Sequence, residues 1–185
     1  MIGNVILDMA ISLDGFIVGA NDEDGGLHNW YFAPAPKSAA VIEELIHTSG
    51  AIVMGRRAYD MGDRYDGYVD NPYKVPHFVL THRVPQQAAK GETSFTFVTE
   101  GIESILKQAK AAAGDKDVVI GGGATIAQQC LKAGLIDEIQ IHLVPVLIGD
   151  GIRLFEHIGA ESIELEQTRV IESAGVTHLK FRVVK

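Results

Sequence analysis

The chain has 185 residues, and its 24 acidic against 16 basic side chains give a formal net charge of −8 at pH 7. A chain of this length forms about one domain and buries on the order of 70% of its unfolded surface. Hydrophobic residues at 46% and charged residues at 22% are ordinary globular values, which exclude disorder and fibrous repeats. The acidic balance argues against nucleic acid as a partner, because phosphate backbones attract clustered Lys and Arg.

Cysteine, targeting and metal signals are sparse. Cys130 is the single cysteine, which excludes an internal disulfide and a cysteine-rich metal site. No group of His, Asp and Glu has metal-ligand spacing, so we expect no metal. Residues 1–20 lack Lys and Arg, unlike a targeting signal, and the longest uncharged run, 118–131, is too short to span a bilayer. We therefore expect one cytoplasmic domain over residues 1–185, with no membrane partner.

The first half of the chain alternates between strand and helix patterns. Apolar residues at every second position predict a strand over 5–11. A helix follows Pro34–Pro36, with one apolar stripe along it, and Gly50 stands where a C-cap belongs. Short apolar runs predict further strands at 51–54, 77–81 and 94–98.

The stretch 60–76 is long and irregular and carries several tyrosines among Asp and Gly residues. Ordered loops of this length are often binding loops or lids. A solvated surface excursion explains the composition equally well.

The second half continues the alternation. A helix with one apolar face begins near Ile102 and is closed by Gly114. A strand over 117–120 enters three glycines, and a helix then runs to about Leu131. A strand over 138–147 follows, and 162–168 with 177–184 are predicted to close the chain as an antiparallel hairpin. This order of elements indicates an α/β fold.

The most specific local signal is the run Gly121-Gly122-Gly123, which joins a buried strand directly to a helix. Without side chains, the backbone N–H groups can approach an anion, and the helix N-terminus adds about half a positive charge. A tight turn in which glycine only relieves strain is the structural alternative. We favour the anion site, because a turn does not require three glycines. Ile126 replaces the third glycine of a dinucleotide fingerprint, and no Gly-Lys-Ser/Thr follows as in a P-loop.

Two basic clusters stand at the ends of other predicted strands. Gly55-Arg56-Arg57 follows one buried strand, and Thr81-His82-Arg83 follows the next. Each cluster alone could be solvated charge. Two such clusters and a glycine turn in an acidic chain suggest a polyanionic small molecule, such as a phosphorylated nucleotide.

Several motifs together point to a known family. The chain resembles the dihydrofolate-reductase-like superfamily, and most closely the branch that holds the reductase domain of bacterial riboflavin biosynthesis. The resemblance extends over nearly the whole chain and rests on Ser12-Leu13-Asp14-Gly15, Met54-Gly55-Arg56, Gly121–Thr125, and the runs 131–138 and 145–151.

The resemblance implies a three-layer α/β/α fold with a central mixed, mostly parallel sheet, a C-terminal antiparallel hairpin, and NADPH across the strand ends. By analogy, phosphates of the adenosine half of the cofactor would contact Gly55, Arg56 and Arg57. The 2′-phosphate and the adenine would lie against Thr81, His82 and Arg83. The pyrophosphate would lie on Gly121, Gly122, Gly123, Ala124, Thr125 and Ile126. The nicotinamide would be bordered by Ala10, Ile11, Gly15 and Ile17.

The chain departs from its relatives at substrate-side positions. Dihydrofolate reductases carry a carboxylate at the start of the first long helix, whereas residues 30–37 contain no acid. The riboflavin-pathway reductases usually show Asp-Pro-x-Leu-Thr where this chain has residues 59–64, and an acid before the glycine turn where it has Gly121. We also expect no fused deaminase domain, since these residues contain no zinc motif of that domain. These departures indicate a stand-alone member whose substrate can differ from the pathway intermediate.

Candidates for contact with the substrate are few. Asp14 could polarise or protonate a substrate, but an Asp before Gly also forms turns. Trp30 could stack on a planar heterocycle or belong to the core. We expect His28 at the surface, Asp60 either at the cleft or in a helical ion pair with the arginine one turn before it, and His142 as a hydrogen-bonded sheet residue.

The combined prediction is an NADPH-dependent reductase that transfers a hydride to a small planar heterocycle, closest to 5-amino-6-(5-phosphoribosylamino)uracil reductase. A reductase of another small molecule is the first alternative, with dihydrofolate disfavoured. A non-catalytic nucleotide-binding module is the second. A homodimer is expected through the hairpin 162–184, since an unpaired strand edge invites pairing.

Overall fold

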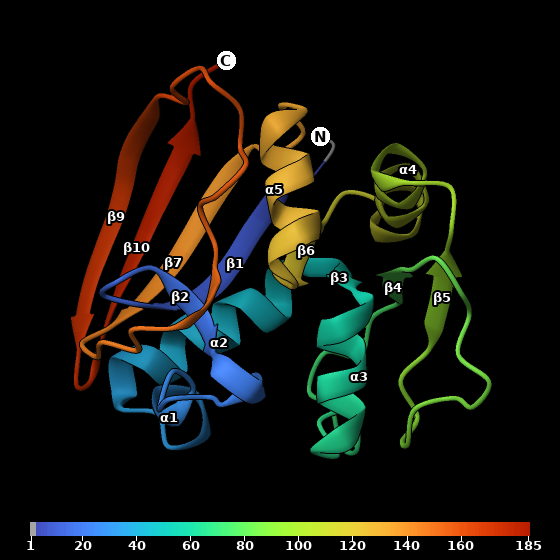
Figure 1. Ribbon diagram of the computed structural model, residues 1–185, viewed down its shortest axis with the longest axis horizontal. Helices are drawn as coiled ribbons and strands as arrows, with labels where there is room; N and C mark the ends of the chain where they lie inside the picture. The colour runs from blue at the N-terminus through green and yellow to red at the C-terminus, as the bar shows by residue number, and fades with distance from the viewer. Residues whose placement is uncertain (1–2) are drawn as a thin grey trace.

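The computed structural model describes residues 3–185 and is built on one large sheet. Its strand order is β5-β4-β3-β6-β1-β7-β10-β9 (Figure 1). The strands are β1 (Val5–Ser12), β3 (Ser49–Gly55), β4 (His77–Leu80), β5 (Phe95–Val98), β6 (Asp117–Gly122), β7 (Glu138–Val144), β9 (Leu165–Ser173) and β10 (Val176–Val183). Pairings from β5 to β7 are parallel, while β10 is antiparallel to β7 and β9. The predicted mixed, mostly parallel sheet with a C-terminal hairpin is confirmed.

Helices cover both faces of this sheet, which gives the predicted three layers (Figure 1). The helices are α1 (Asn29–Phe32), α2 (Pro36–Thr48), α3 (Arg56–Arg64), α4 (Ile102–Ala113) and α5 (Ala124–Lys132), with a short 3-10 turn η1 (Ala20–Asp22). α4 and α5 pack on one face, and α2 lies on the other. No helix in residues 3–185 combines the length and apolar character that crossing a bilayer requires.

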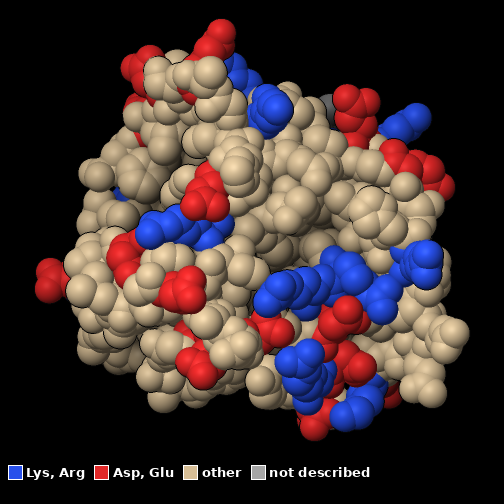
Figure 2. Space-filling view, in the orientation of Figure 1, with Lys and Arg blue, Asp and Glu red and all other residues tan. Residues whose placement is uncertain are grey.

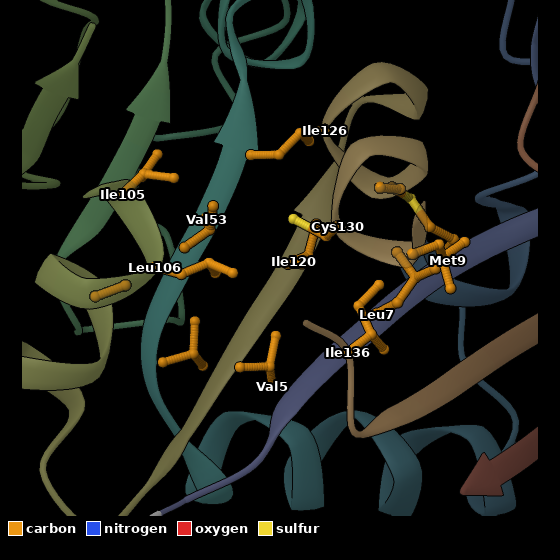
Figure 3. Packing of buried hydrophobic residues seen from close by; sticks show 14 of the residues in the cluster. Val5, Leu7, Met9, Val53, Ile105, Leu106, Ile120, Ile126, Cys130 and Ile136 are labelled. Carbon is orange, nitrogen blue, oxygen red and sulfur yellow. The ribbon is translucent and has the colours of Figure 1, made fainter. Parts of the chain in front are cut away.

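The alternation within β1 explains how a central strand contributes to both layers. Val5, Leu7 and Met9 point into the main core together with side chains of α4 and α5 (Figure 3). Ala10 points the other way and packs in a second cluster with Trp30. Burial on both faces is typical of central parallel strands.

Several local predictions were wrong in their details. Gly50 is not a C-cap, because α2 ends at Thr48 and Gly50 lies within β3. A Cβ at this glycine would lie 2.7 Å from the Ala113 carbonyl oxygen, so close packing against the end of α4 accounts for it. The stretch predicted as irregular from residue 60 is helical as far as Arg64.

Three short elements escaped the sequence analysis. β2 (Phe16–Gly19) and β8 (Gly151–Arg153) form a separate antiparallel pair, and α1 has only four residues. Elements this short contain at most two strand periods or about one helical turn, which is too little for a pattern to be recognised. The hairpin strands also lie closer to their turn than predicted, and β7 ends at Val144.

Candidate functional site

A cleft of about 1600 Å³ opens at the carboxyl ends of β1, β3, β4 and β6. Ligands of open α/β sheets bind at this edge. Figure 2 shows a hollow on this side of the molecule with a band of Lys and Arg side chains, interspersed with acids, near the position of α3. We call one part the basic half, formed by residues 55–57, 81–83 and 121–126. The acidic half is formed by Asp8, Trp30, Tyr31, Tyr73 and His142.

Two helix N-termini meet in the basic half. α3 begins directly after Gly55 at the end of β3, and α5 begins directly after Gly123 beside the end of β6. Among the described residues, no side chain caps either helix. The first-turn N–H groups therefore face the cleft with the positive ends of both helix dipoles, an arrangement suited to phosphate.

The need for glycine differs among the three glycine positions of the turn. A Cβ on Gly122 would lie 2.7 Å from Ala58 Cβ, and Gly123 has a φ of 95°. A Cβ on Gly121 would meet nothing closer than 3.8 Å. Two glycines thus permit α3 and α5 to start side by side, and this same approach brings their N–H groups together. The geometry thus agrees with the tight-turn interpretation and also leaves the N–H groups where an anion site requires them.

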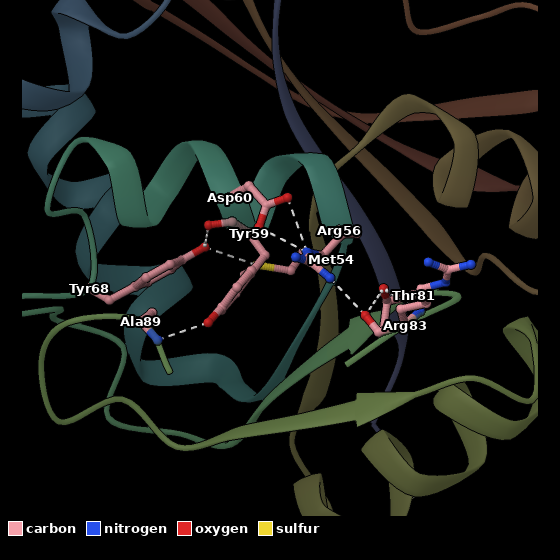
Figure 4. Close-up of polar contacts among 8 residues, drawn as sticks. All are labelled: Met54, Arg56, Tyr59, Asp60, Tyr68, Thr81, Arg83 and Ala89. Carbon is pink, nitrogen blue, oxygen red and sulfur yellow. Dashed lines mark hydrogen bonds and ion pairs between the residues drawn. The ribbon is translucent and has the colours of Figure 1, made fainter. Parts of the chain in front are cut away.

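The arginines of the basic half are held by carboxylates and carbonyls. Arg56 Nε donates to both oxygens of Asp60 at 2.8 and 3.0 Å, and its Nη1 donates to the Arg83 carbonyl at 2.7 Å (Figure 4). The helical ion pair considered for Asp60 is therefore present. Arg57 pairs across the cleft with Asp22 of η1. Exposed ion pairs of this kind contribute about 0–1 kcal/mol, so an incoming phosphate can compete for the guanidinium groups.

The segment after β4 forms the rim of the basic half. The Thr81 hydroxyl donates to the Arg83 carbonyl at 2.8 Å and accepts from the Arg83 N–H at 3.2 Å, which shapes the turn (Figure 4). His82 and Arg83 lie exposed on this rim. Thr81 thus positions two side chains of the rim, while its own hydroxyl is engaged.

Part of the tyrosine-rich stretch is anchored rather than solvated. Tyr68 is buried, and its hydroxyl lies 3.2 Å from both Met54 Sδ and the Tyr59 carbonyl oxygen, so these two acceptors share its one proton (Figure 4). The Tyr59 hydroxyl accepts from the Ala89 N–H at 2.9 Å. Residues 65–73 line the cleft, which favours the binding-loop interpretation of this stretch.

The acidic half is built around Asp8, whose side chain is 14% exposed. Its Oδ1 accepts from Gln140 Nε2 at 3.0 Å and from His142 Nε2 at 2.9 Å. Trp30 packs against the His142 ring with centroids 4.5 Å apart. The Trp30 Nε1–H is buried and has no acceptor within residues 3–185.

Two tyrosines complete the acidic half. Burial raises the pKa of Tyr31 and of Tyr73, and the neighbouring Asp8 carboxylate adds to both shifts. Both hydroxyls therefore remain protonated at neutral pH and can donate hydrogen bonds. Among the described residues that line the cleft, the only Lys or Arg side chains are Arg56, Arg57 and Arg83, all in the basic half.

The structure separates the residues expected near the nicotinamide. Ala10 and Ile17 line the cleft, whereas Ile11 packs in the main core and Gly15, at a φ of 92°, forms a turn outside the lining. Trp30 lies at the cleft, as expected of a substrate-side residue.

Asp14 lies outside the cleft lining, in a network that joins two loops. Its carboxylate accepts the Ser12 hydroxyl at 2.6 Å and the N–H groups of Ile148 and Gly149. The Ser12 hydrogen bond is the largest cause that lowers the pKa of Asp14 to about 2, with the two backbone N–H groups adding to it. A carboxyl group with this pKa is a poor proton donor at neutral pH. We therefore correct its assignment from substrate contact to loop structure.

Asp8, Tyr31 and Tyr73 were not found by sequence analysis, and His142 was seen only as a sheet residue. It is hydrogen-bonded in the sheet as expected, but it also lines the cleft. The available signal was a charged residue inside the apolar run 5–11 and a histidine inside 138–144. His28 pairs with Asp24 near the surface, as expected, and it also lines the cleft.

Comparison with known proteins identifies the family. The family described as the RibD C-terminal domain matches residues 4–179. The chain belongs to this family. The uncharacterized protein YyaP of Bacillus subtilis is 24% identical over 184 residues, which cover 96% of this chain and 93% of YyaP.

Solved structures agree with this assignment. A Shewanella sp. PV-4 protein named after riboflavin biosynthesis superposes with a TM-score of 0.80 at 26% identity, over 98% of this chain and 99% of that one. A dihydrofolate reductase from Enterococcus faecalis, solved with NADP(H), superposes with a TM-score of 0.67 at 18% identity, over 100% and 99% of the two chains, and shows the shared fold. These findings support an oxidoreductase related to the reductases of riboflavin biosynthesis.

Proposed function

We propose that the chain is an NADPH-dependent reductase that transfers a hydride to a small planar heterocycle. The observation that carries this proposal is the basic half of the cleft, where two uncapped helix N-termini and three arginines converge in a member of the RibD C-terminal domain family. The reaction closest to this proposal is the reduction of 5-amino-6-(5-phosphoribosylamino)uracil.

The residues of the cleft fit this cofactor. The N–H groups that follow Gly55 and Gly123 would hold the pyrophosphate, and Arg83 with His82 would contact the 2′-phosphate. Ala10 and Ile17 would border the nicotinamide. When bound, NADPH supplies the hydride, and the protein contributes orientation and the proton.

The test is a titration with NADPH and separately with NADH, followed by thermal unfolding and Trp30 fluorescence. A ligand at 100 times its Kd adds about 2.7 kcal/mol of stability, which a melting curve resolves. We expect selective stabilisation by NADPH that Arg83→Ala weakens. The control Arg182→Ala removes an exposed arginine that pairs with Glu166 on the C-terminal hairpin. No stabilisation by either nucleotide contradicts the proposal, and binding without turnover leaves a nucleotide-binding module.

The charge of the acidic half favours a substrate without phosphate. A phosphoryl group in this half would approach the Asp8 carboxylate and find no Lys or Arg in the described lining. A reductase of a different, unphosphorylated heterocycle is therefore a second candidate. Turnover of 5-amino-6-(5-phosphoribosylamino)uracil can be compared with turnover of its dephosphorylated form. A higher kcat/KM for the phosphorylated form contradicts this candidate.

We also propose that the chain forms one domain and a homodimer in solution. β9 is an edge strand of the sheet, and Leu165 and Val170 on it are exposed. Unpaired edges with apolar side chains favour pairing with a second chain. Light scattering should give twice the 20.0 kDa of one chain, and a mass of 20.0 kDa would exclude the dimer.

A further inference from the structure

A row of hydrogen-bonded side chains runs beneath the acidic half, from the turn of the C-terminal hairpin to the cleft. Ser173 Oγ and Ser38 Oγ are 2.9 Å apart, and Ser38 Oγ is 2.9 Å from His178 Nε2. The Nδ1 atoms of His178 and His142 are 2.7 Å apart, and His142 Nε2 is 2.9 Å from Asp8 Oδ1. Five side chains from β9, α2, β10, β7 and β1 thus form one continuous path.

The two ends of this row are accessible, and its middle is not. Asp8 lines the cleft, and Ser173 is partly exposed at the hairpin turn. Ser38, His142 and His178 have relative exposures of 0%, 2% and 3%. The register of the sheet sets the histidines directly opposite each other on β7 and β10. The path therefore crosses a dry layer between solvent and the cleft.

A buried cluster that only satisfies its hydrogen-bonding groups would not need two histidine rings paired through their Nδ1 atoms. Two imidazole Nδ1 atoms at hydrogen-bond distance need one donor and one acceptor, so the proton between them belongs to either ring. Burial, with the neighbouring His142 as the next cause, lowers the pKa of His178 to about 4. His178 therefore carries a single ring proton at neutral pH, on Nδ1 or on Nε2.

Both proton arrangements satisfy every contact of the row. In the first, Ser173 donates to Ser38, Ser38 donates to His178 Nε2, His178 Nδ1–H donates to His142 Nδ1, and His142 Nε2–H donates to Asp8. In the second, His142 carries protons on both nitrogens, and His178 carries its proton on Nε2, toward Ser38. The second arrangement holds one proton more than the first, gained from Ser38, and loss of the His142 Nε2 proton toward Asp8 leaves both rings in the opposite tautomers.

We propose that this row is a proton relay, in which the Asp8 carboxylate passes a proton to the substrate and the two histidines and two serines deliver it from solvent. The proposal rests on the proposed reductase function. A hydride adds to the carbon of a C=N bond, the π electrons move to nitrogen, and Asp8 passes to that nitrogen the proton that it takes from His142 Nε2. In the same transfer His178 Nδ1–H moves to His142 Nδ1, Ser38 protonates His178 Nε2, Ser173 restores the Ser38 hydroxyl, and water restores Ser173. After the product leaves, one proton that returns from water in the cleft by the reverse path restores the starting tautomers of both rings.

Other charged and titratable groups surround the row. After burial and His142, the charge of Arg169 on β9 also lowers the pKa of His178. Arg169 Nη1 donates to the Glu44 carboxylate of α2 at 2.7 Å. Tyr31 and Tyr73 line the cleft with Asp8, and after burial the Asp8 charge adds to the raised pKa of both hydroxyls. Arg169 disfavours a resident cation on His178, so a proton passes through this ring without being stored on it.

The first test needs no substrate. Nuclear magnetic resonance of isotope-labelled histidine rings can follow the exchange of the His142 and His178 N–H groups with heavy water. We expect exchange in the wild type and persistent ring N–H signals in Ser38→Ala and in Ser173→Ala, which interrupt the path. Ser173→Ala lies at the partly exposed turn and is the milder change. The control is Ser104→Ala on α4, where the serine contacts Gln108 at the surface. Unchanged exchange in both path variants overturns the relay.

The second test follows the destination of the proton. General acids contribute about 10²- to 10⁴-fold to rate, so Asp8→Asn should slow single-turnover NADPH oxidation by about that factor and flatten its pH profile. Ser38→Ala should lower kcat with KM unchanged and raise the solvent isotope effect. An unaltered pH profile in Asp8→Asn contradicts the assignment of Asp8. If wild type binds NADPH but turns over no heterocycle, the reductase and the proton's destination both fail, while the exchange experiment still decides whether the row conducts protons.

Discussion

The two halves of the cleft are built by different means. The basic half consists of backbone N–H groups at two strand–helix junctions and of arginines in exposed ion pairs. The acidic half rests on the row of hydrogen-bonded side chains beneath it, whose polar atoms contact one another across three strands and a helix. Recognition by backbone tolerates the change of any single side chain, whereas a buried network depends on each member. We therefore expect substitutions in the acidic half to have the larger effects.

The largest effect should come from Trp30. Removal of a buried aromatic side chain costs about 3–5 kcal/mol, so Trp30→Ala should lower the free energy of unfolding by that amount. Trp30→Phe keeps most of the packing and removes the unpaired Nε1–H, and it should cost less than about 1.5 kcal/mol. Urea unfolding of both variants measures the difference. Equal losses would show that packing around Trp30 is not what stabilises this half.

The pH dependence of stability should report on His178. Its folded pKa of about 4 lies below the ordinary 6.5, so the unfolded chain binds more protons between these values. Stability from this group is therefore complete above about pH 6.5 and falls as the pH drops toward 4, by at most about 3 kcal/mol. Urea unfolding at several pH values should show this loss, and His178→Gln should reduce it. An identical slope in the variant would contradict the shift.

A substitution at the glycine turn tests the basic half through its backbone. Gly122→Val sets side-chain atoms against Ala58, where even a Cβ would be 2.7 Å away, and should cost about 1–3 kcal/mol. It should also weaken NADPH binding, since α3 and α5 can no longer start side by side. The matched control is Gly121→Ala, whose Cβ has 3.8 Å of space. Thermal unfolding with and without NADPH distinguishes the two variants, and equal behaviour would reject this explanation.

The smallest effect should come from the ion pair across the cleft. Asp22→Asn releases Arg57, and Arg64 at 3.6 Å, from their shared carboxylate partner. It should change stability by less than about 1 kcal/mol, because the side chains of both arginines are largely exposed. NADPH binding should become modestly tighter, as one arginine no longer has to leave an acid. Glu166→Gln, which breaks the exposed pair with Arg182, is the control. Weaker NADPH binding in Asp22→Asn would show that Asp22 orients Arg57 instead of competing for it.

The same contrast explains what the sequence could predict. The residues of the basic half are contiguous motifs at strand ends, such as Gly55-Arg56-Arg57, and all of them line the cleft. Residues of the acidic half and of the row beneath it are distant in sequence, and only the order and register of β1, β7 and β10 bring Asp8, His142 and His178 together. Asp14 belongs to a contiguous motif and was still assigned wrongly. Its carboxylate accepts the N–H groups of Ile148 and Gly149, and no local sequence pattern connects these residues to it.

The interior position of the only cysteine has a practical consequence. Cys130 is fully buried in the main core, and burial raises the pKa of its thiol to about 11 (Figure 3). Thiol reagents and oxidants act on exposed thiolates, so the folded protein should be inert to both. A single cysteine introduced at the hairpin turn or at the rim of the cleft would then be the one position that accepts a fluorescent label. Site-specific spectroscopy therefore does not require the removal of the native cysteine.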